Sequence, residues 1–597
     1  MRVSFSPAPT EPVTTRREVW AWYSYGFASE AYVVVALTSF IPITLEAMAA
    51  EQGHLFGTTE PCVARPNSTA IPSAVADHSP VERPRCMISF GNIELDTASF
   101  VMYLTSLAVF LQALTVVSIS SMADHGSYRK KQLVVFSAVG SIATMLIGAM
   151  PFVWMAGALS VMANVAFGAG IVCFNAYLPL LVRNMDYIRR QRERLQTAER
   201  ELQTLQGQNI ATRAPGSLDD TGLEGQPSTL EEEIERKQQQ YKELAEKQTV
   251  EQGQLMGQIS ARGFASGYLG GILLLLLCLY ISYRDKSSTS SLKIGIFLSG
   301  LWWNVFAALA GLWLKPRPGR ELRIEDRGQK RGSLWVAFQY VQYSWSRVGA
   351  TIVQARKLPN AFAFLVAWFF LSDGYTSIAN VALLFAKTSL QLSQTLLILL
   401  SLVVPICALV GTLIFPKVQQ VLGFDQKRMV LLLLAMLVMV PVYGTLGILL
   451  PFWPHLSSAR ELFALAAYYG FLIGAVQSFC RSMFADLVPR GRESEFFGLY
   501  AITDKGSSWL GPLAVAAITD ATHEIRHAFV FLLVLLSVPI PIIYFGVNME
   551  QGRRDADKAS EDLLKTLDNG GLNIGPGEES GGREGAEEEQ ERLLASV

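Results

Sequence analysis

Charged residues are scarce in this chain. Lys, Arg, Asp and Glu make up 17% of its 597 residues, whereas hydrophobic residues make up 50%. Soluble domains carry roughly 25% charged residues, so this composition argues against a soluble protein. The formal net charge is -1 at pH 7. Because there is no basic excess, the charge gives no reason to expect a nucleic-acid partner.

The motifs that serve catalysis and ATP-driven pumping are also missing. No glycine-rich loop ending in Lys-Ser or Lys-Thr is present, which excludes an ATP motor of the P-loop kind in this chain. The six histidines are scattered and show no metal-ligand spacing. No constellation for covalent catalysis is found. We therefore expect no enzyme activity, no cofactor and no metal.

A cleavable signal peptide is not expected either. The first nineteen residues are polar and contain no short apolar core followed by a small-residue cleavage site.

Long apolar runs dominate the rest of the sequence. A hydrocarbon core about 30 Å thick is crossed by a helix of roughly 20 mostly apolar residues. Twelve runs reach this length, at 20–47, 98–122, 132–150, 153–182, 260–282, 292–314, 361–385, 393–415, 429–450, 461–487, 497–519 and 527–547. We predict an all-α protein of the lipid bilayer with twelve transmembrane helices. Proteins of this kind mostly move solutes across a membrane.

Basic residues in the short loops predict the orientation. They are Arg16 and Arg17, Arg129 to Lys131, Lys315 to Arg323, Lys417 to Arg428, and Arg490 with Arg492. All of them fall on one side of the predicted spans if both termini share that side. Short loops rich in Lys and Arg face the cytosol. We therefore expect both termini in the cytosol.

The loop 49–97 after the first span falls on the opposite side. It contains a sequon that predicts N-glycosylation at Asn67, and it holds Cys62 and Cys86, the two cysteines outside the spans. A sequon and a cysteine pair in one loop indicate an oxidising compartment, so we predict a disulfide between Cys62 and Cys86. The alternative is that both features arise by chance.

Similar segments recur in the same order in two six-helix halves. The first helix of each half carries an acid in a similar context, Glu30 within Phe27–Tyr32 and Asp373 within Phe370–Tyr375. Three further pairs correspond, namely the loops 124–131 and 417–428, the segments 177–179 and 486–489, and the segments 267–270 and 508–511. Four correspondences in one order argue for duplicated halves, as in major facilitator transporters.

These observations divide the chain into seven segments. They are a cytosolic N-terminal segment 1–19, helices one to four at 20–182, a cytosolic and largely flexible insertion 183–259, helices five and six at 260–314, a central loop 315–360 with an amphipathic helix, helices seven to twelve at 361–547, and a disordered acidic cytosolic tail 548–597. The insertion is expected to form charged, solvated helices. The second of these would run from Ser228 to Gln252, with Ser228 and Glu231 as a capping box.

Polar side chains inside the spans are the candidate functional groups, because they are costly in a bilayer and usually face the bundle interior. Candidates for binding a substrate or a coupling proton are Glu30, Asp373, Asn380, Asp504 and Lys505. Structural pairing is the alternative for the charged groups. For amides such as Asn175 and Gln477 we favour interhelical hydrogen bonds. Arg481, near Asp486, is expected to form a structural ion pair or a gate.

The loop 124–131 resembles the signature between helices two and three of major facilitator proteins. Asp124, Arg129 and Lys130 are predicted to act as a latch between helix ends in one conformation of the transport cycle. The match is partial, because the usual first glycine is missing and Ser120 and Ser121 lie nearby.

Several motifs together resemble one family. They are the glutamate-bearing first span, Phe174–Pro179, Gly267–Gly271, Phe370–Gly374 and Phe496–Tyr500. This set looks like the fungal autophagy-related protein 22 family, vacuolar amino-acid effluxers of the major facilitator superfamily. The resemblance covers essentially all twelve spans. It implies a location in the vacuole membrane and release to the cytosol of leucine and other neutral amino acids after autophagic degradation, but it assigns no substrate-binding residues.

We therefore expect alternating access, with an amino-acid site at the midplane between the halves. Asp373 or Glu30 would bind the ammonium group, and Lys505 or Asn380 the carboxylate. An embedded acid could also carry a proton. Two alternatives stay open. One is a transporter of another small solute, such as a sugar, a peptide or a metabolite. The other is a non-transporting membrane scaffold that uses the insertion and the tail.

The end of the tail carries a pattern similar to an acidic dileucine sorting signal, with Glu589 ahead of Leu593 and Leu594. Vacuolar sorting adaptors are the expected partners. Replacing both Leu593→Ala and Leu594→Ala should shift the protein from the vacuole towards the cell surface, with its fold unchanged. Microscopy of a tagged chain measures this shift. An unchanged vacuolar location would mean that the pattern is coincidental.

Overall fold

Eleven helices are long and apolar enough to cross a membrane in the part of the chain that the structure describes. This structure, a computed structural model, describes residues 2–5, 11–55, 61–62, 86–90, 93–213, 227–284, 288–319, 322–324, 345, 358–388, 390, 392, 394–449, 458–507, 511, 514–515, 518, 522, 527–568 and 572–573. The expected span 497–519 begins as α14 (Glu493–Ser507) and continues into residues that are only partly described.

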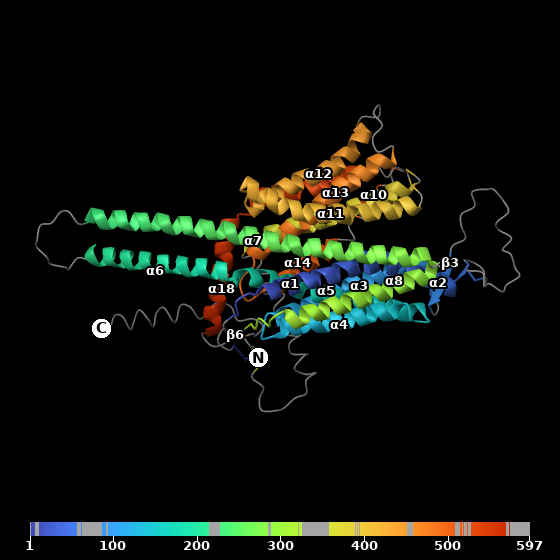
Figure 1. The fold of residues 1–597 in the computed structure, drawn as a ribbon, viewed down its shortest axis with the longest axis horizontal. Helices are drawn as coiled ribbons and strands as arrows, with labels where there is room; N and C mark the ends of the chain where they lie inside the picture. The colour runs from blue at the N-terminus through green and yellow to red at the C-terminus, as the bar shows by residue number, and fades with distance from the viewer. Residues whose placement is uncertain are drawn as a thin grey trace, which may run out of the picture.

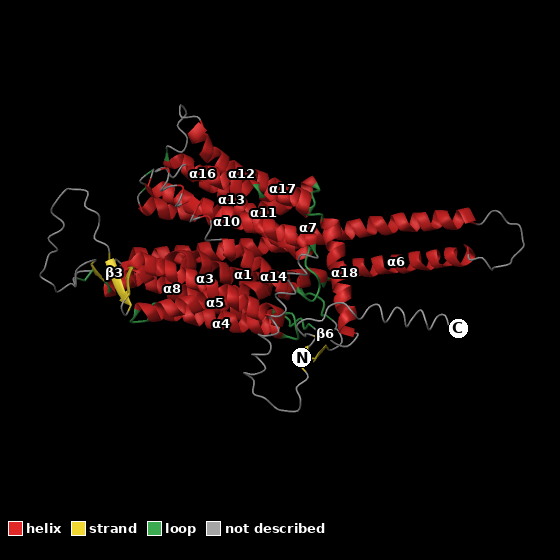
Figure 2. Ribbon diagram, turned by 180° about the vertical axis from the view of Figure 1, so that it is seen from behind, coloured by secondary structure: helices red, strands yellow, loops and turns green. Residues whose placement is uncertain are grey.

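The helices follow the order that the apolar runs predict (Figures 1 and 2). In the first half they are α1 (Arg16–Ala31), the π-helical segment η1 (Tyr32–Phe40), α2 (Ile41–Gln52), α3 (Thr97–Ala123), α4 (Tyr128–Ile147), α5 (Val153–Arg183), α6 (Asp186–Arg213), α7 (Pro227–Arg284) and α8 (Ser288–Trp313). In the second half they are α10 (Pro359–Thr388), α11 (Gln394–Leu422), α12 (Gln426–Leu449), α13 (Ala459–Asp486), α14, α16 (Ala528–Ser537), α17 (Pro539–Gly546) and α18 (Met549–Asp568). The first span is thus built from α1, η1 and α2 in succession.

Two small antiparallel sheets accompany the helices. One has the order β2 (His54–Leu55), β3 (Cys86–Phe90), β4 (Ile93–Asp96), and the other has the order β5 (Leu322–Ile324), β1 (Arg2–Phe5), β6 (Leu572–Asn573). They lie at opposite ends of the bundle (Figure 1). We call the end with β2 to β4 the apical side, and the end with α18 and the start of α1 the basal side.

A disulfide joins β3 of the apical sheet to the segment that precedes it. Cys62 and Cys86 are bonded, with their Cα atoms 5.8 Å apart. The sequon at Asn67 lies outside the described residues.

Side chains fix where the first span begins. Thr15 caps α1, because its hydroxyl accepts from the N–H of Glu18 while the Glu18 carboxylate accepts from the N–H of Thr15. The same carboxylate forms an ion pair with Arg317, whose Nη2 lies 3.2 Å from Glu18 Oε1. Both side chains are buried. The segment that follows α8 is thereby joined to the basal end of α1.

The insertion and the fifth span form one continuous helix. We expected a charged helix that ends near residue 252 and a separate span from residue 260, but α7 runs through both as 58 residues. No proline interrupts it, and its two glycines at the junction sit against neighbours. A Cβ on Gly253 would contact Gln426 and Arg553, and one on Gly257 would contact Phe479. Contacts on this face support the helix across the junction.

The first part of the expected disordered tail is a helix that packs on the basal side. In α18, the buried positions are Met549, Gly552, Ala556 and Ser560, a spacing that places them on one helical face. Arg553 on this helix donates to Asp486 Oδ2 from Nε at 2.8 Å and from Nη2 at 2.5 Å. The average composition of the tail is polar, so the narrow apolar face was missed. The dileucine segment lies outside the described residues.

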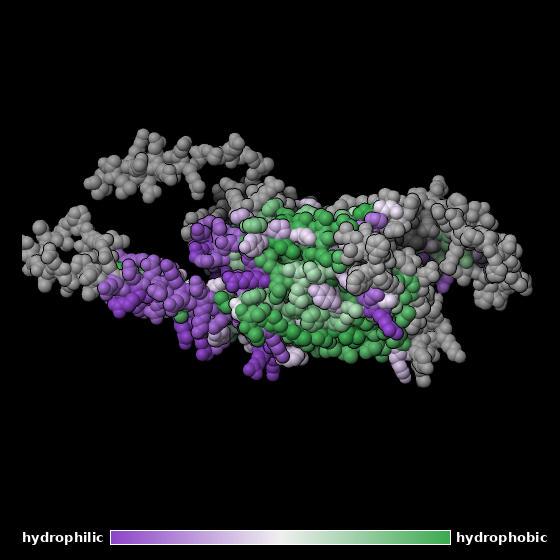
Figure 3. Space-filling model, turned by 90° about the horizontal axis from the view of Figure 1, so that it is seen from above, coloured by the Kyte–Doolittle hydropathy of each residue, from purple (hydrophilic) through white to green (hydrophobic). Residues whose placement is uncertain are grey.

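Large apolar side chains cover the outside of the bundle. Phe110, Leu279 and Phe545 are examples that lie in three different helices and are at least half exposed. Figure 3 shows a broad hydrophobic surface over the bundle, whereas the α6–α7 projection is hydrophilic. An apolar belt of this extent is typical of a surface that lies against lipid.

Glycines allow close helix contacts inside each half. A Cβ placed on Gly411 of α11 would lie 1.8 Å from the carbonyl oxygen of Phe471 in α13. That atom belongs to the backbone, so the clash cannot be relieved by a side-chain rotation. By contrast, a Cβ on Gly207 of the exposed helix α6 would meet nothing within 4 Å.

We expect Gly411→Ala to lower the thermal stability of the purified protein, at a free-energy cost of about 1–3 kcal/mol, because overpacking forces α11 and α13 apart. Gly207→Ala is the matched control and should leave the melting temperature unchanged or slightly higher, since alanine favours a helix. Thermal unfolding in detergent measures both variants. Equal stabilities would contradict the close contact.

Candidate functional site

A buried carboxylate joins the two halves on the basal side. Asp124, in the turn after α3, accepts from Arg129 Nη2 at 2.5 Å. It also accepts from the N–H groups of Ser494 and Glu495, at 2.9 and 3.0 Å. These N–H groups belong to the first turn of α14, where the unpaired backbone donors and the helix dipole favour an anion.

A second acid extends this contact. Glu493 in the first turn of α14 lies 3.4 Å from Arg129 Nη2 and 3.0 Å from Arg183 Nη1. Arg183 also donates to the carbonyl oxygen of Val488, at 3.0 Å. We call Asp124, Arg129, Arg183 and Glu493 the basal latch. All four side chains are buried, and each ion pair except Asp124–Arg129 crosses between the halves.

The structure thus places Asp124 and Arg129 in contact and adds two partners that the sequence did not indicate. Lys130, the third residue predicted for the latch, is half-buried, and its side chain takes no part in the ion pairs of the latch. Burial raises the pKa of Asp124 to about 7 against the opposing effect of Arg129, and Glu493 and Glu495 add to the rise. This carboxyl therefore binds a proton more readily than an exposed aspartate does.

Arg481 of α13 is the other buried cation between the halves. Its Nε donates to Ser260 Oγ at 3.1 Å and its Nη2 to the Ser260 carbonyl at 3.0 Å, both on α7. Its Nη1 donates to Asn175 Oδ1 on α5 at 3.3 Å. The expected ion pair with Asp486 is not formed, since Asp486 binds Arg553. Residues five apart on a helix do not share a face, which explains the difference.

Glu30 lies one turn further along α7 than Arg481, since Gly263 of α7 adjoins Arg481 and Gly267 adjoins Glu30. Its Cγ occupies the space beside Gly267 of α7, where a Cβ would come within 2.4 Å of it. The neighbouring Tyr268 donates its hydroxyl to Gln477 Oε1 at 3.1 Å, which joins α7 to α13. Glu30 and Tyr268 both lie close enough to Arg481 to act on its charge. At this part of the interface the first half thus presents an acid, and the second half presents an amide and a guanidinium.

Asp373 and Asp504 lie together on the contact of α10 with the eleventh span. Asp373 is 2% exposed and accepts from the N–H of Gly511 at 3.1 Å. Asp504 accepts from the hydroxyls of Ser372 and Tyr375, at 2.5 and 3.2 Å. Both acids therefore have partners within the second half. Their surroundings differ from those of Glu30, which packs on α7 in the first half.

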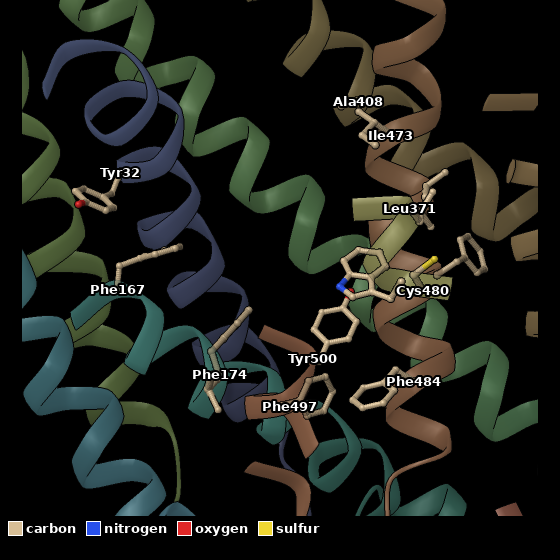
Figure 4. Packing of buried hydrophobic residues seen from close by; sticks show 14 of the residues in the cluster. Tyr32, Phe167, Phe174, Leu371, Ala408, Ile473, Cys480, Phe484, Phe497 and Tyr500 are labelled. Atoms are coloured by element: carbon tan, nitrogen blue, oxygen red, sulfur yellow. The ribbon is translucent and has the colours of Figure 1, made fainter. Parts of the chain in front are cut away.

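An aromatic cluster is formed by α10, α13 and α14 of the second half. Tyr500 of α14 stacks on Trp368 of α10 with ring centroids 4.6 Å apart, and Phe484 of α13 lies 5.2 Å from Tyr500. Figure 4 shows Tyr500, Phe497 and Phe484 side by side, facing Phe174 of the first half. Aromatic side chains of both halves therefore belong to one buried hydrophobic cluster at the interface.

The side chains of Asn380 and Lys505 lie outside the described ones, although both residues are helical. Sequence reasoning treated Arg481 as a structural residue and did not single out Glu493 at all. The signal available for Arg481 was its position within an apolar span, which is costly for a cation. For Glu493 it was the placement of two acids in a first helical turn.

A cavity of about 1340 Å³ opens on the basal side between α6, α7 and α18, and Asp124 and Arg183 of the basal latch are among its lining residues. Its lining mixes bases such as Arg192 and Arg490 with acids such as Glu246 and Asp557. Burial lowers the pKa of Arg192 to about 10, with Arg490 and Arg183 adding to the effect. This cavity lies outside the membrane-spanning part, so we do not assign the translocated solute to it.

Sequence comparison connects the chain with a family. A sequence model described as vacuole effluxer Atg22 like matches residues 14–557. Autophagy-related protein 22-2 of Sclerotinia sclerotiorum is 38% identical over 567 residues, which cover 92% of this chain and 82% of that protein. Autophagy-related protein 22-1 of Aspergillus fumigatus is 36% identical over 572 residues, which cover 91% of each chain.

Solved structures connect the fold with major facilitator transporters. The proton:xylose symporter XylE bound to 6-bromo-6-deoxy-D-glucose superposes with a TM-score of 0.53 at 10% identity, over 90% of this chain and 98% of XylE. A bacterial homologue of the iron transporter ferroportin in an outward-facing state gives 0.51 at 10% identity, over 89% and 99% of the two chains. At this identity the likeness shows the fold alone, and it confirms the predicted fold class.

The latch geometry predicts how the basal side opens. Glu493→Gln removes the charge that Arg129 and Arg183 share, so the basal ends of the halves should separate more readily. A cysteine placed at Ser120, which faces Gly498 of α14, should then react about tenfold faster with a maleimide added from the basal side.

Asp186→Asn is the matched control. It removes an exposed ion pair with Arg190, whose side chains are 70% (Arg190) and 62% (Asp186) exposed, and exposed pairs contribute little. The labelling rate should stay unchanged in this variant. Equal rates in Glu493→Gln and in the parent would show that the latch does not hold the basal side closed.

Proposed function

Because the chain belongs to the family of Atg22-like vacuole effluxers, we propose that it exports leucine and other neutral amino acids from the vacuole lumen to the cytosol. The family and the fold make it a multi-pass membrane transporter. Proteins of this family and fold are carriers, so we assign no catalytic residues. The family match over nearly the whole chain is the observation that carries the proposal.

The basal side is the cytosolic side in this proposal. The described segments nearest the two ends of the chain, β1 and β6, belong to it, as do the described parts of the short basic loops and the α6–α7 projection. The apical side, with the disulfide Cys62–Cys86, then faces the lumen, where an oxidising environment suits a disulfide. A lumenal solute would approach the interface between the halves from that side.

The conformation supports alternating access. The basal latch and the bonds of Arg481 tie the halves together on the basal side. A carrier that is closed on the cytosolic side receives its solute from the lumen. Release to the cytosol then requires that these contacts break, so the solute must bind better to a state in which they are loosened.

Glu30 is the group we assign to the ammonium of the substrate. It is half-buried, it belongs to the first half, and it lies beside Tyr268, which bonds to Gln477 of the second half. An acid at a contact between halves can bind a cation that arrives there. Asp373 is more enclosed and already receives a backbone N–H, which fits proton binding better than direct contact with the ammonium. Transport coupled to protons would use this second acid.

Two other functions agree with parts of the structure. A major facilitator carrier of another small solute, such as a sugar, a peptide or a metabolite, has the same fold. A non-transporting scaffold is favoured by the α6–α7 projection, which is exposed and charged. Tyr187 and Gln191 of α6 both donate to Glu251 of α7, so the two helices are adjacent at the base of the projection.

The test is leucine efflux from isolated vacuoles of cells that lack a family effluxer. Vacuoles with this chain should release labelled leucine faster than vacuoles without it. Glu30→Gln and Asp373→Asn should reach the vacuole in normal amounts with near-normal melting temperatures, yet lose most of the efflux, since each removes a charge from the transport path. If protons are coupled at these acids, the residual flux should also lose its pH dependence.

A chain without residues 192–250 is the control for the scaffold. The helices α6 and α7 are adjacent at the base of the projection, so a short linker can join residues 191 and 251. A carrier should keep its flux after this deletion. Normal efflux from both acid variants would refute the site, and poor expression of both would support a structural role. Transport of a labelled sugar or peptide in place of leucine would favour the other carrier.

A further inference from the structure

Arg481 is a buried cation that forms no ion pair with a carboxylate among the described residues. It is 4% exposed, and its hydrogen bonds go to a hydroxyl, a backbone carbonyl and a side-chain amide. Other buried arginines, Arg129 and Arg317, each contact a carboxylate. Buried charges are usually neutralised by a partner. The guanidinium of Arg481 has no carboxylate in an ion pair with it among the described residues, and Glu30 is the acid that lies close enough to act on its charge.

Aromatic rings hold this guanidinium in place. Its Cζ lies 4.1 Å from the ring centroid of Phe264, 5.0 Å from Trp22 and 5.6 Å from Phe174. Trp22 is itself fixed, because it stacks on Phe174 at 4.5 Å and its Nε1 donates to the Phe174 carbonyl at 2.9 Å. Cation–π contacts favour a cation at this position without supplying a counter-ion. The charge is thus positioned rigidly and left available.

The position of Arg481 joins three helices of the first half to one of the second. Trp22 is on α1, Asn175 on α5, and Ser260 and Phe264 on α7, whereas Arg481 is on α13. Gln477 lies one turn away on the same face of α13 and bonds to Tyr268, which adjoins the packing partner of Glu30. Glu30, the acid assigned to the substrate's ammonium group, and the guanidinium of Arg481 therefore lie near each other at one part of the interface.

We propose that Arg481 binds the carboxylate of the substrate and that this binding releases the halves. The inference rests on the proposed function and extends it, because it limits the substrates to solutes that carry a carboxylate. A planar guanidinium fork matches a carboxylate in a two-bond geometry. The three hydrogen bonds that Arg481 makes within the protein leave further N–H donors of the fork unused.

The same contact couples binding to opening. The bonds from Arg481 to Asn175 and Ser260 join α13 to α5 and α7, and these helices must separate when the basal side opens. A carboxylate on the fork competes with these neutral acceptors and forms stronger, charge-assisted bonds. The substrate thereby offsets the loss of the contacts between the halves. An empty carrier lacks this compensation and stays closed on the basal side.

Counterflow of labelled leucine in proteoliposomes tests the carboxylate preference. Unlabelled leucine should inhibit the flux of the unmodified chain, whereas leucinamide, which has an amide in place of the carboxylate, should inhibit about tenfold more weakly or less. Arg481→Lys keeps the charge but loses the planar fork, so the KM for leucine should rise by about tenfold or more. Arg460→Lys on the exposed start of α13 is the matched control and should behave as the unmodified chain.

Ligand-dependent melting of the unmodified chain tests the carboxylate preference even if Arg481→Lys does not fold. Leucine and 4-methylpentanoate, which keep the carboxylate, should both raise the melting temperature, and leucinamide should not. Equal inhibition by leucinamide, or a normal leucine KM in Arg481→Lys, would overturn the role of Arg481 and leave leucine export standing. No leucine counterflow by the unmodified chain would overturn leucine export, and the inference with it.

Discussion

A charge buried between two helix bundles needs an opposite charge or polar partners. If the partners belong to the other bundle, the contact holds the two halves together. On the basal side of this transporter the requirement is met by Asp124, Arg129, Arg183 and Glu493. A buried ion pair adds little net stability, because desolvation offsets the attraction. When one partner of the pair is removed or moves away, however, the other partner is left as an uncompensated buried charge. Such a network is therefore suited to define two discrete states rather than to strengthen one of them.

Two buried arginine sites between the halves differ in the partners that compensate their charge. The latch is neutralised by acids of the same chain, so its closed state is complete without a ligand. Arg481 has neutral acceptors and aromatic rings instead. A solute with a negative group can improve the second site but has nothing to add to the first. This division separates the contact that keeps the carrier closed from the contact that responds to substrate, and both lie on the basal half of one interface.

Much of the architecture could be predicted from the sequence, because membrane spans depend on the length and polarity of local segments. The spans, the paired acids Glu30 and Asp373 and the loop with Asp124 and Arg129 are all local patterns. The surroundings of Arg481 are different. Its partners Trp22, Asn175 and Ser260 come from three helices that are far apart in sequence, so no local pattern reveals them. The helix α18 was missed for another reason. Its buried face is narrow, and its average composition resembles that of a disordered tail.

The continuity of α7 has a mechanical consequence. A helix rises about 1.5 Å per residue, so its 58 residues form a rod of about 87 Å. One part of this rod packs on α1 and α13 inside the membrane, and the other part projects beyond the basal side with α6 beside it (Figure 1). No break separates the two parts. Any tilt of the fifth span during the transport cycle must therefore swing the projecting end through a larger arc. The position of the distal tip of the projection consequently reports which side of the membrane the carrier is open to. Conversely, a partner that binds the tip and restricts its movement would also restrict the tilt of the fifth span.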